Sequence, residues 1–450
     1  MRIQFILENE WPPLAWHLSL NWESGCVIRH GEQVDVWEDR FFEGVWDGDF
    51  ENAAFDKAEH PCGSGAVITD EEVLLVPPFH PHERIYFSPE RLDASNSLRC
   101  FLSVSGESLS PEVPCYKPFF LEALRGGASK KLPRLPLAGG QSVALLELHP
   151  WRLRRTGGER VEPIQRPCHF EEFRGYAQSM RSGMQRFVMN ASAPGRRARF
   201  EPKVELSTGF DSVAVGVWAR EVGVNVALST TGVEDALGIG EQLGFDVRAK
   251  HLDEISNLPD SVFLEFCLLP LGRNIPMALH EGNHRGTLLF SGHGGDEMWG
   301  MKPAFQGSEI ARPRDQILAG VSYTEYRLRV GLVVIPFPLY NQAHHEVIGA
   351  ISQSEDMIRF RDADPDYCRP IPRRVGVERG LGWRDFGIAK QKGQIRFLSE
   401  FPASIRFAIQ SFARTQQPSN SFLDYAMNWA HATAENPYSA KSKGFTSPLK

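Results

Sequence analysis

The chain has 450 residues and a formal net charge of −7, from 49 basic and 56 acidic residues. This length suits about two or three domains. Its shares of hydrophobic residues (42%) and charged residues (23%) are typical of a soluble globular protein. The acidic balance argues against a nucleic-acid-binding surface. No apolar run of about 18 residues occurs, so we expect no membrane span.

The first residues and the cysteines point to a reducing compartment. Met1–Trp11 has only a short apolar patch before Glu8, unlike a secretory signal. The seven cysteines are scattered, their number is odd, and none forms a CxxC pair. We therefore expect neither a disulfide framework nor a zinc site, and we expect a cytoplasmic protein.

The first 150 residues have the pattern of a β-rich domain. Short apolar or alternating runs recur there, separated by turn residues such as those of Asp47–Asp49 and Gly139–Gly140. This pattern predicts a sandwich or layered sheets. The Arg- and Gly-bearing segment Trp151–Arg166 is expected to be a connector. His169–Asn190 has apolar residues at helical spacing, which predicts an amphipathic helix, so residues 151–190 form the expected link.

From Lys203 the pattern alternates between strand and helix, which predicts a parallel, doubly wound sheet. We assign this second domain to residues 191–435, expect mainly helices after Gly300, and expect residues 436–450 to be a frayed tail. The predicted strands are Val204–Leu206, Val224–Leu228, Asp246–Ala249 and Leu288–Phe290, and the predicted helices are Asp211–Glu221, Val233–Leu243, part of Leu264–His280 and Tyr340–Ser354.

The stretch Lys203–Val217 reads as a strand, a tight loop and a helix N-terminus. Such a loop directs backbone N–H groups outward at the positive end of a helix, which favours phosphate. Ser207 and Ser212 add hydroxyl groups, and Asp211 adds a carboxylate suited to Mg²⁺. The alternative is an ordinary helix capped by Ser or Asp.

A second segment, Thr287–Gly300, reads TLLFSGHGGDEMWG, again a strand followed by a Ser-Gly turn. The two segments together resemble the signatures of the asparagine synthetase family of ATP pyrophosphatases. In that family the first loop is usually Ser-Gly-Gly-x-Asp-Ser and the second is Ser-Gly-x-Gly-x-Asp-Glu-x-x-Gly. The second segment matches over its whole length, whereas the first departs at Thr208, where the family has Gly. The resemblance covers roughly the C-terminal two thirds of the chain.

The N-terminal part also resembles this family, in its glutaminase half, through Glu83–Phe87 and Ala94–Leu98. The family's glutaminase uses a Cys directly after the initiator Met, whose free α-amino group serves the thiolate. Here Arg2 follows Met1, and Cys26 is internal. We therefore expect a degenerate, Ntn-hydrolase-like domain over residues 1–150 without glutaminase activity, with a structural role or a role in partner binding.

The resemblance implies ATP and Mg²⁺ as cofactors and gives each candidate residue a role. Asp211 and Asp296 would bind the metal, and Lys390, or else Lys392, would be the catalytic cation, while His293 stands where asparagine synthetases usually have Glu. The expected nucleotide-binding residues are Ser207, Thr208, Gly209, Asp211, Ser212, Ser229, Thr230, Ser291 and Gly292. Arg373 and Arg374 are further candidates for holding pyrophosphate.

Several of these interpretations have structural alternatives. His293 is either a general base or a loop residue bonded to the backbone, and Ser229 and Thr230 are either nucleotide contacts or a helix cap. The lysines can equally form a solvated basic turn. Thr208 carries a steric cost if its position requires a positive φ.

The sequence thus predicts an ATP-dependent, AMP-forming amide ligase. It would adenylate a carboxylate and pass the acyl group to ammonia or to an amine. A peptide is a possible substrate, and a homodimer or a complex with a biosynthetic partner protein is a possible assembly. One alternative is an intramolecular cyclase of the β-lactam or macrolactam type, and another is a nucleotide-binding relative without catalysis. An RNA-thiolating pyrophosphatase of the same fold would need catalytic cysteines near the loop and a basic surface, and neither is evident.

Overall fold

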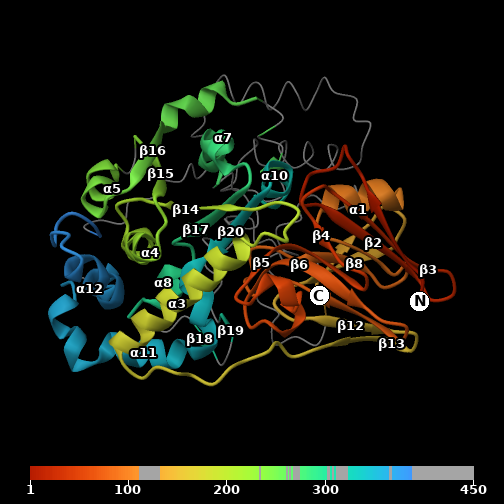
Figure 1. Cartoon of the computed structure of the whole chain (residues 1–450), viewed down its shortest axis with the longest axis horizontal. Helices are drawn as coiled ribbons and strands as arrows, with labels where there is room; N and C mark the ends of the chain where they lie inside the picture. The colour runs from red at the N-terminus through yellow and green to blue at the C-terminus, as the bar shows by residue number, and fades with distance from the viewer. Residues whose placement is uncertain are drawn as a thin grey trace, which may run out of the picture.

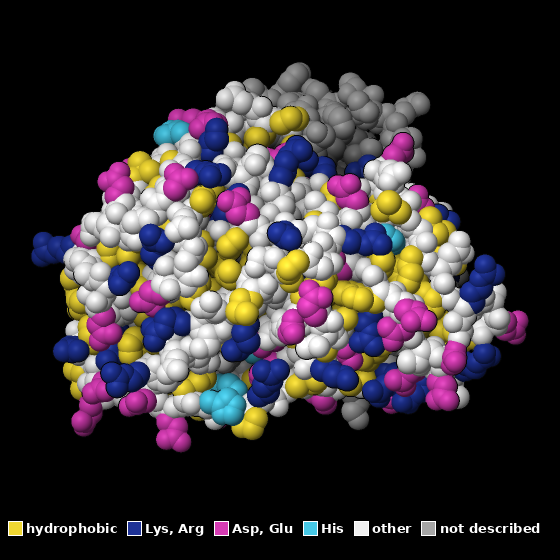
Figure 2. All heavy atoms as spheres, viewed as in Figure 1, with side chains coloured by type: hydrophobic (Ala, Val, Ile, Leu, Met, Phe, Trp, Pro, Cys, Tyr) yellow, Lys and Arg dark blue, Asp and Glu magenta, His cyan; other side chains and the backbone are white. Residues whose placement is uncertain are grey.

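A computed structural model gives the fold of the chain, which is mixed α/β (Figure 1). It describes residues 1–110, 132–232, 235–259, 262, 265–266, 274–301, 305–306, 309–310, 323–363 and 367–387. No helix in these ranges is long and apolar enough to cross a membrane. On the face drawn in Figure 2, basic and acidic side chains are interspersed.

The N-terminal part consists of two sheets of mainly antiparallel strands. The seven-stranded sheet, in the order β1-β3-β2-β9-β8-β11-β10, contains β1 (Ile3–Leu7), β2 (Trp16–Asn21), β3 (Gly25–His30), β8 (Ile85–Ser88), β9 (Asp93–Ser95), β10 (Arg134–Pro136) and β11 (Ser142–Leu146). The six-stranded sheet, in the order β13-β12-β7-β6-β5-β4, contains β4 (Asp35–Val36), β5 (Arg40–Trp46), β6 (Pro61–Ile68), β7 (Glu72–Val76), β12 (Trp151–Arg154) and β13 (Gly157–Arg160).

These two sheets enclose one apolar core. Trp16 and Ile28 of one sheet lie in the same buried cluster as Phe41 and Leu75 of the other, because alternate side chains of each strand face inward. The predicted β-rich layers are therefore confirmed. The connector begins later than expected, because Trp151–Arg160 forms β12 and β13, with β12 pairing with β7.

The second part is built on a five-stranded parallel sheet in the order β16-β15-β14-β17-β20. Its strands are β14 (Glu201–Glu205), β15 (Val226–Thr231), β16 (Asp246–His251), β17 (Thr287–Ser291) and β20 (Leu332–Pro336). The chain builds outward from β14 to β16 and then returns to place β17 on the other side of β14. The strand order therefore reverses between β14 and β17, which is where ligands bind in sheets of this kind.

Helices cover both faces of this sheet, so β17 and β20 are buried on both sides. Leu288 and Phe290 of β17 pack into the cluster that contains α3 and α4, whereas Leu289 packs into the cluster on the opposite face. The described helices are α1 (Leu98–Ser105), α3 (Phe173–Ala191), α4 (Phe210–Glu221), α5 (Leu237–Leu243), α7 (Glu281–His284), α8 (Gly295–Met298), α10 (Thr324–Val330), α11 (His345–Gln353) and α12 (Pro370–Glu378), with 3-10 turns η1 (Phe50–Asn52), η2 (Phe55–Lys57), η4 (Leu252–Asn257), η5 (Ile275–His280), η6 (Phe337–His344) and η7 (Glu355–Phe360).

Most predicted elements of this part are present within a few residues of their expected bounds. The main difference is β20, a buried strand in a region expected to be mainly helical. Its run Leu332–Pro336 is too short for periodicity to distinguish a buried strand from a helix. A short pair, β18 (Phe305–Gln306) and β19 (Glu309–Ile310), also follows Gly300.

A buried ion cluster joins the N-terminal sheets to the parallel-sheet part. Arg327 of α10 donates hydrogen bonds of 2.8 and 3.0 Å to the two carboxylate oxygens of Glu43 and also pairs with Glu83. All three side chains are at most 4% exposed. On the same helix, Glu325 accepts a 2.8 Å hydrogen bond from the Ser97 hydroxyl. Helix α10 is thus docked on the N-terminal part through charged groups that water does not reach.

We predict that Arg327→Ala destabilises the protein strongly. Removing the guanidinium leaves two acidic side chains buried without their cation, which typically costs about 3–5 kcal/mol. Urea unfolding measures the loss. Arg285→Ala is the matched control, because Arg285 is 70% exposed in its pair with Glu281 and such surface changes cost at most about 0.5 kcal/mol. Equal losses in the two variants would contradict the importance of the cluster.

A second prediction concerns pH. Burial raises the pKa of Glu83 to about 8, although Arg327 acts in the opposite direction. The folded chain therefore keeps a proton that the unfolded chain releases near its ordinary pKa, so the stability from protonated Glu83 is lost as pH rises from about 5 to 8. Glu83→Gln cannot ionise. Its free energy of unfolding, measured in urea from pH 5 to 8, should fall less than that of the wild type, and parallel pH profiles would exclude this role.

Candidate functional site

Two strand-to-helix loops lie together where the strand order of the parallel sheet reverses. β14 and β17 are parallel neighbours, with Val204 opposite Phe290, so the loops that follow them leave the same edge. A Cβ atom on Gly292 would lie 2.7 Å from the backbone nitrogen of Ser212, and one on Gly295 would lie 2.2 Å from Cγ of Asp211. The loops are therefore in close contact, and glycine is required at both positions.

The first loop is held by its own hydroxyl groups. The Ser207 and Ser212 hydroxyls lie 2.8 Å apart, and Oγ of Ser207 accepts a 3.1 Å hydrogen bond from the Gly209 backbone N–H. Gly209 is the N-cap of α4, and no side chain caps this helix. The alternative of an ordinary side-chain cap therefore does not apply, and the first turn of α4 directs its N–H groups toward this edge.

Thr208 fits the loop without backbone strain. Among the described residues, the non-glycine residues with positive φ are Ala53, Leu92 and Leu148, and Thr208 is not one of them. Its carbonyl oxygen accepts a 2.8 Å hydrogen bond from the backbone N–H of Gly387, which fixes the loop to the chain beyond α12. The steric cost considered from the sequence is therefore absent.

The two predicted metal ligands, Asp211 and Asp296, meet beside an arginine. Arg369, the residue before α12, donates a 2.6 Å hydrogen bond to Oδ1 of Asp296. Burial lowers the pKa of Arg369, but the carboxylates of Asp211 and Asp296 outweigh this effect and raise it. Both carboxylates thus lie near the Arg369 guanidinium, and carboxylate oxygens are ligands that suit Mg²⁺.

The second loop contacts a row of buried histidines from the N-terminal part. Nδ1 of His293 lies 3.1 Å from the Ser291 hydroxyl, and the rings of His293 and His82 meet edge to face with centroids 5.6 Å apart. The His82 ring lies 5.5 Å from that of His80. Burial lowers the pKa of His80 to about 3 and that of His82 well below its ordinary value, so both rings are neutral. The N-terminal part thus packs against the loop that carries His293.

Ser229 and Thr230 lie near the end of β15, the strand next to β14. The Thr230 hydroxyl lies 3.3 Å from Nε2 of His280, in η5. Burial lowers the pKa of His280 to about 4, so this ring is neutral at pH 7 and serves as a hydrogen-bond partner. Ser229 is buried. The pair therefore lies at the same sheet edge as the two loops, and a neutral histidine holds Thr230.

The predicted catalytic cations Lys390 and Lys392 lie outside the described residues. Arg373, considered as a pyrophosphate ligand, is buried and donates to the carbonyl oxygens of Trp383 and Phe386 at 2.6 and 2.8 Å, so it has a structural role. Arg374 bonds Glu378 at 2.8 Å.

Sequence reasoning missed Arg369, which is the arginine at the site. One signal was available, because Pro370 is typical of the first position of a helix and so places Arg369 at the helix N-terminus.

A comparison with family models gave no match for this chain, and a comparison with curated proteins gave none either. The interpretation of the site therefore depends on its residues and their geometry.

We predict that Gly292→Ala weakens ATP binding. The added methyl group would press on the Asp211–Ser212 backbone and move the two loops apart. Such overpacking costs about 1–3 kcal/mol, and the same cost in binding lowers the affinity roughly 5-fold to 160-fold. Titration with a fluorescent ATP analogue measures this loss. Gly282→Ala, in α7, is the control, because no described atom lies within 4 Å of its added Cβ. Unchanged affinity of Gly292→Ala would mean that nucleotide does not use these loops.

Proposed function

We propose that the protein is an ATP-dependent, AMP-forming carbon–nitrogen ligase of the asparagine synthetase type. The observation that carries this proposal is the convergence of two loops at the point of strand reversal. There, the uncapped N-terminus of α4 lies beside Asp211, Asp296 and Arg369. Helix N–H groups and serine hydroxyls suit the phosphates of ATP. A carboxylate pair near an arginine suits Mg²⁺ and departing pyrophosphate.

The reaction would proceed in two balanced steps. A carboxylate oxygen of the substrate attacks the α-phosphorus, and the bond to the bridging oxygen breaks, which releases pyrophosphate and forms an acyl-adenylate. An amine nitrogen then attacks the acyl carbon, loses a proton and expels AMP. Asp211 and Asp296 would hold Mg²⁺, which neutralises phosphate charge when bound. Ser207 and the backbone N–H groups of α4 orient the phosphates, and Arg369 offsets the charge of the leaving pyrophosphate.

His293 is the candidate that takes the proton from the amine. Its contact with the Ser291 hydroxyl and the edge-to-face contact with His82 fix the orientation of its ring. A neutral imidazole accepts a proton near pH 7. The His82 contact also supports a positioning role for the N-terminal part, which packs against the loop that carries His293.

The amine would be free ammonia or part of a second substrate, because the described cysteines of the N-terminal part, Cys26, Cys62 and Cys100, are buried. Burial raises the pKa of the Cys26 thiol to about 12. A thiol with such a pKa is not a nucleophile near neutral pH. The described cysteines are free thiols, which suits a reducing cytoplasm.

One observation favours a second candidate function, in which the protein binds nucleotide but does not catalyse a reaction. Arg369 already bonds Asp296 at 2.6 Å, so a cation occupies part of the position expected for Mg²⁺. An intramolecular cyclase remains a form of the first proposal, in which the acid and the amine belong to one molecule, such as a peptide.

We predict that the protein releases pyrophosphate from ATP when Mg²⁺ and a suitable carboxylic acid are present. Asp296→Asn should lower the rate of release by at least about a hundredfold, because a charge that stabilises the transition state is lost. A screen of carboxylic acids with a coupled pyrophosphate assay measures the rate. Asp246→Asn is the control, because Asp246 lies on the same sheet but starts β16 at the opposite edge and is 63% exposed in its pair with Arg248.

Three outcomes separate the candidates. ATP binding without pyrophosphate release for any acid tested would favour the non-catalytic relative. Release with full activity in Asp296→Asn would refute the assignment of the site. Release that needs no added amine, with a cyclic product, would identify the cyclase form.

A further inference from the structure

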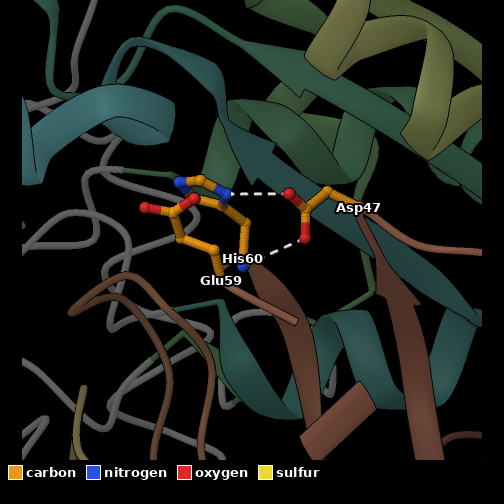
Figure 3. A group of neighbouring side chains, drawn as sticks. All are labelled: Asp47, Glu59 and His60. Atoms are coloured by element: carbon orange, nitrogen blue, oxygen red, sulfur yellow. Dashed lines mark hydrogen bonds and ion pairs between the residues drawn. The ribbon is translucent and has the colours of Figure 1, made fainter. Parts of the chain in front are cut away.

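A second group of polar side chains lies in the N-terminal part, between the ends of two antiparallel strands. Asp47 follows β5, and Glu59 and His60 directly precede β6. Figure 3 shows the carboxyl groups of Asp47 and Glu59 on opposite sides of the His60 side chain. One potential ligand atom from each of the three residues lies within 4.8 Å of the other two. These residues are not part of the loops that follow β14 and β17, and they have no role in the proposed ligase reaction.

The His60 ring is held in a fixed orientation. Its Nδ1 lies 3.1 Å from one carboxylate oxygen of Asp47, and its backbone N–H donates a 3.2 Å hydrogen bond to the other. The ring also packs against Tyr340 of η6 in a tilted contact, with centroids 4.1 Å apart. One ring nitrogen of His60 and one carboxylate oxygen of Asp47 therefore already face each other, and a metal ion there would replace the proton that they share.

Two arginines balance the carboxylates when no ion is present. Arg186 lies 4.0 Å from Oδ2 of Asp47, and Arg166 lies 4.0 Å from Oε2 of Glu59. The Arg166 backbone N–H also donates a 3.1 Å hydrogen bond to Glu59. Asp47 is fully buried, whereas the two arginine side chains are 41% and 49% exposed. Arg186 also bonds the Tyr340 hydroxyl. Because both arginine side chains reach solvent, they can move away from the carboxylates when a cation enters.

A cavity of about 270 Å³ adjoins this group, and Glu59 and His60 form part of its wall. The rest of the wall is mainly apolar and includes Val76, Phe79 and Pro150, with the Gln342 side chain at one side. A metal at the group would therefore face a partly open space that can hold water or a small ligand. Structural zinc sites are usually closed by four protein ligands, whereas sites that bind an exogenous ligand keep a position open.

We propose that Asp47, Glu59 and His60 bind a divalent transition-metal ion, with a coordination position open toward the cavity. One imidazole and two carboxylates form a nitrogen and oxygen donor set that suits Zn²⁺ and its neighbours. Bonds of about 2.0–2.2 Å bring ligand atoms to about 3–4 Å from one another, so the separations present here need only small side-chain movements.

Zn²⁺ is the probe in the test. The full chain is treated with a chelator and titrated with Zn²⁺ by calorimetry, and bound metal is counted after dialysis. We expect the wild type to bind about one equivalent of Zn²⁺. In His60→Gln and in Glu59→Gln this equivalent should be lost on dialysis, and the affinity for Zn²⁺ should be at least about tenfold lower. Zn²⁺ should also raise the melting temperature of the wild type. Glu59→Gln keeps the test valid if the more buried His60 variant does not fold.

Two control variants separate this site from other sources of binding. His149→Gln removes another histidine that lines the same cavity, and this variant should still bind one equivalent of Zn²⁺. Asp296→Asn removes a ligand of the proposed Mg²⁺ site and should also keep it. Failure of the wild type to bind Zn²⁺, or equal binding by Glu59→Gln and the wild type, would overturn the metal site without bearing on the ligase proposal.

Discussion

The pairing of Arg327 with Glu43 and Glu83 is the interaction on which the arrangement of the two parts depends. Its three ionisable side chains are buried between the N-terminal sheets and helix α10. A buried charge is tolerated only when its partner is in place, so the docked arrangement requires Arg327 to lie against both carboxyl groups. The same helix leads directly into β20, the edge strand of the parallel sheet. The cluster therefore fixes the N-terminal part relative to the sheet that carries the candidate site.

This fixed arrangement has a consequence at the site itself. The segment His80–Arg84 supplies Glu83 to the cluster and His82 to the contact with His293. One short stretch of the N-terminal part thus reaches both the joint between the two parts and the loop that follows β17. The N-terminal part therefore has a structural role, because the loop at the proposed acyl-transfer site packs on it.

The candidate site follows from the reversal of strand order between β14 and β17. Neighbouring parallel strands place their carboxyl ends at one edge, so residues 85 positions apart, Asp211 and Asp296, come together. Gly292 and Gly295 permit this approach, because any side chain there would collide with the first loop. Arg369 arrives from a third element and adds the positive charge that two adjacent carboxylates need in a partly buried position.

The sequence by itself determined the β-rich start, the strand and helix alternation after Lys203 and the two loops, because apolar periodicity and glycine turns are local signals. It did not reveal β20, since a short apolar run has no distinguishing period, nor β12 and β13, whose polar residues pair at a sheet edge. Only the tertiary structure brought Arg369 to Asp296, His82 to His293 and Asp47 to His60. Those contacts join residues on different elements, and their geometry is set by packing and topology rather than by spacing along the chain.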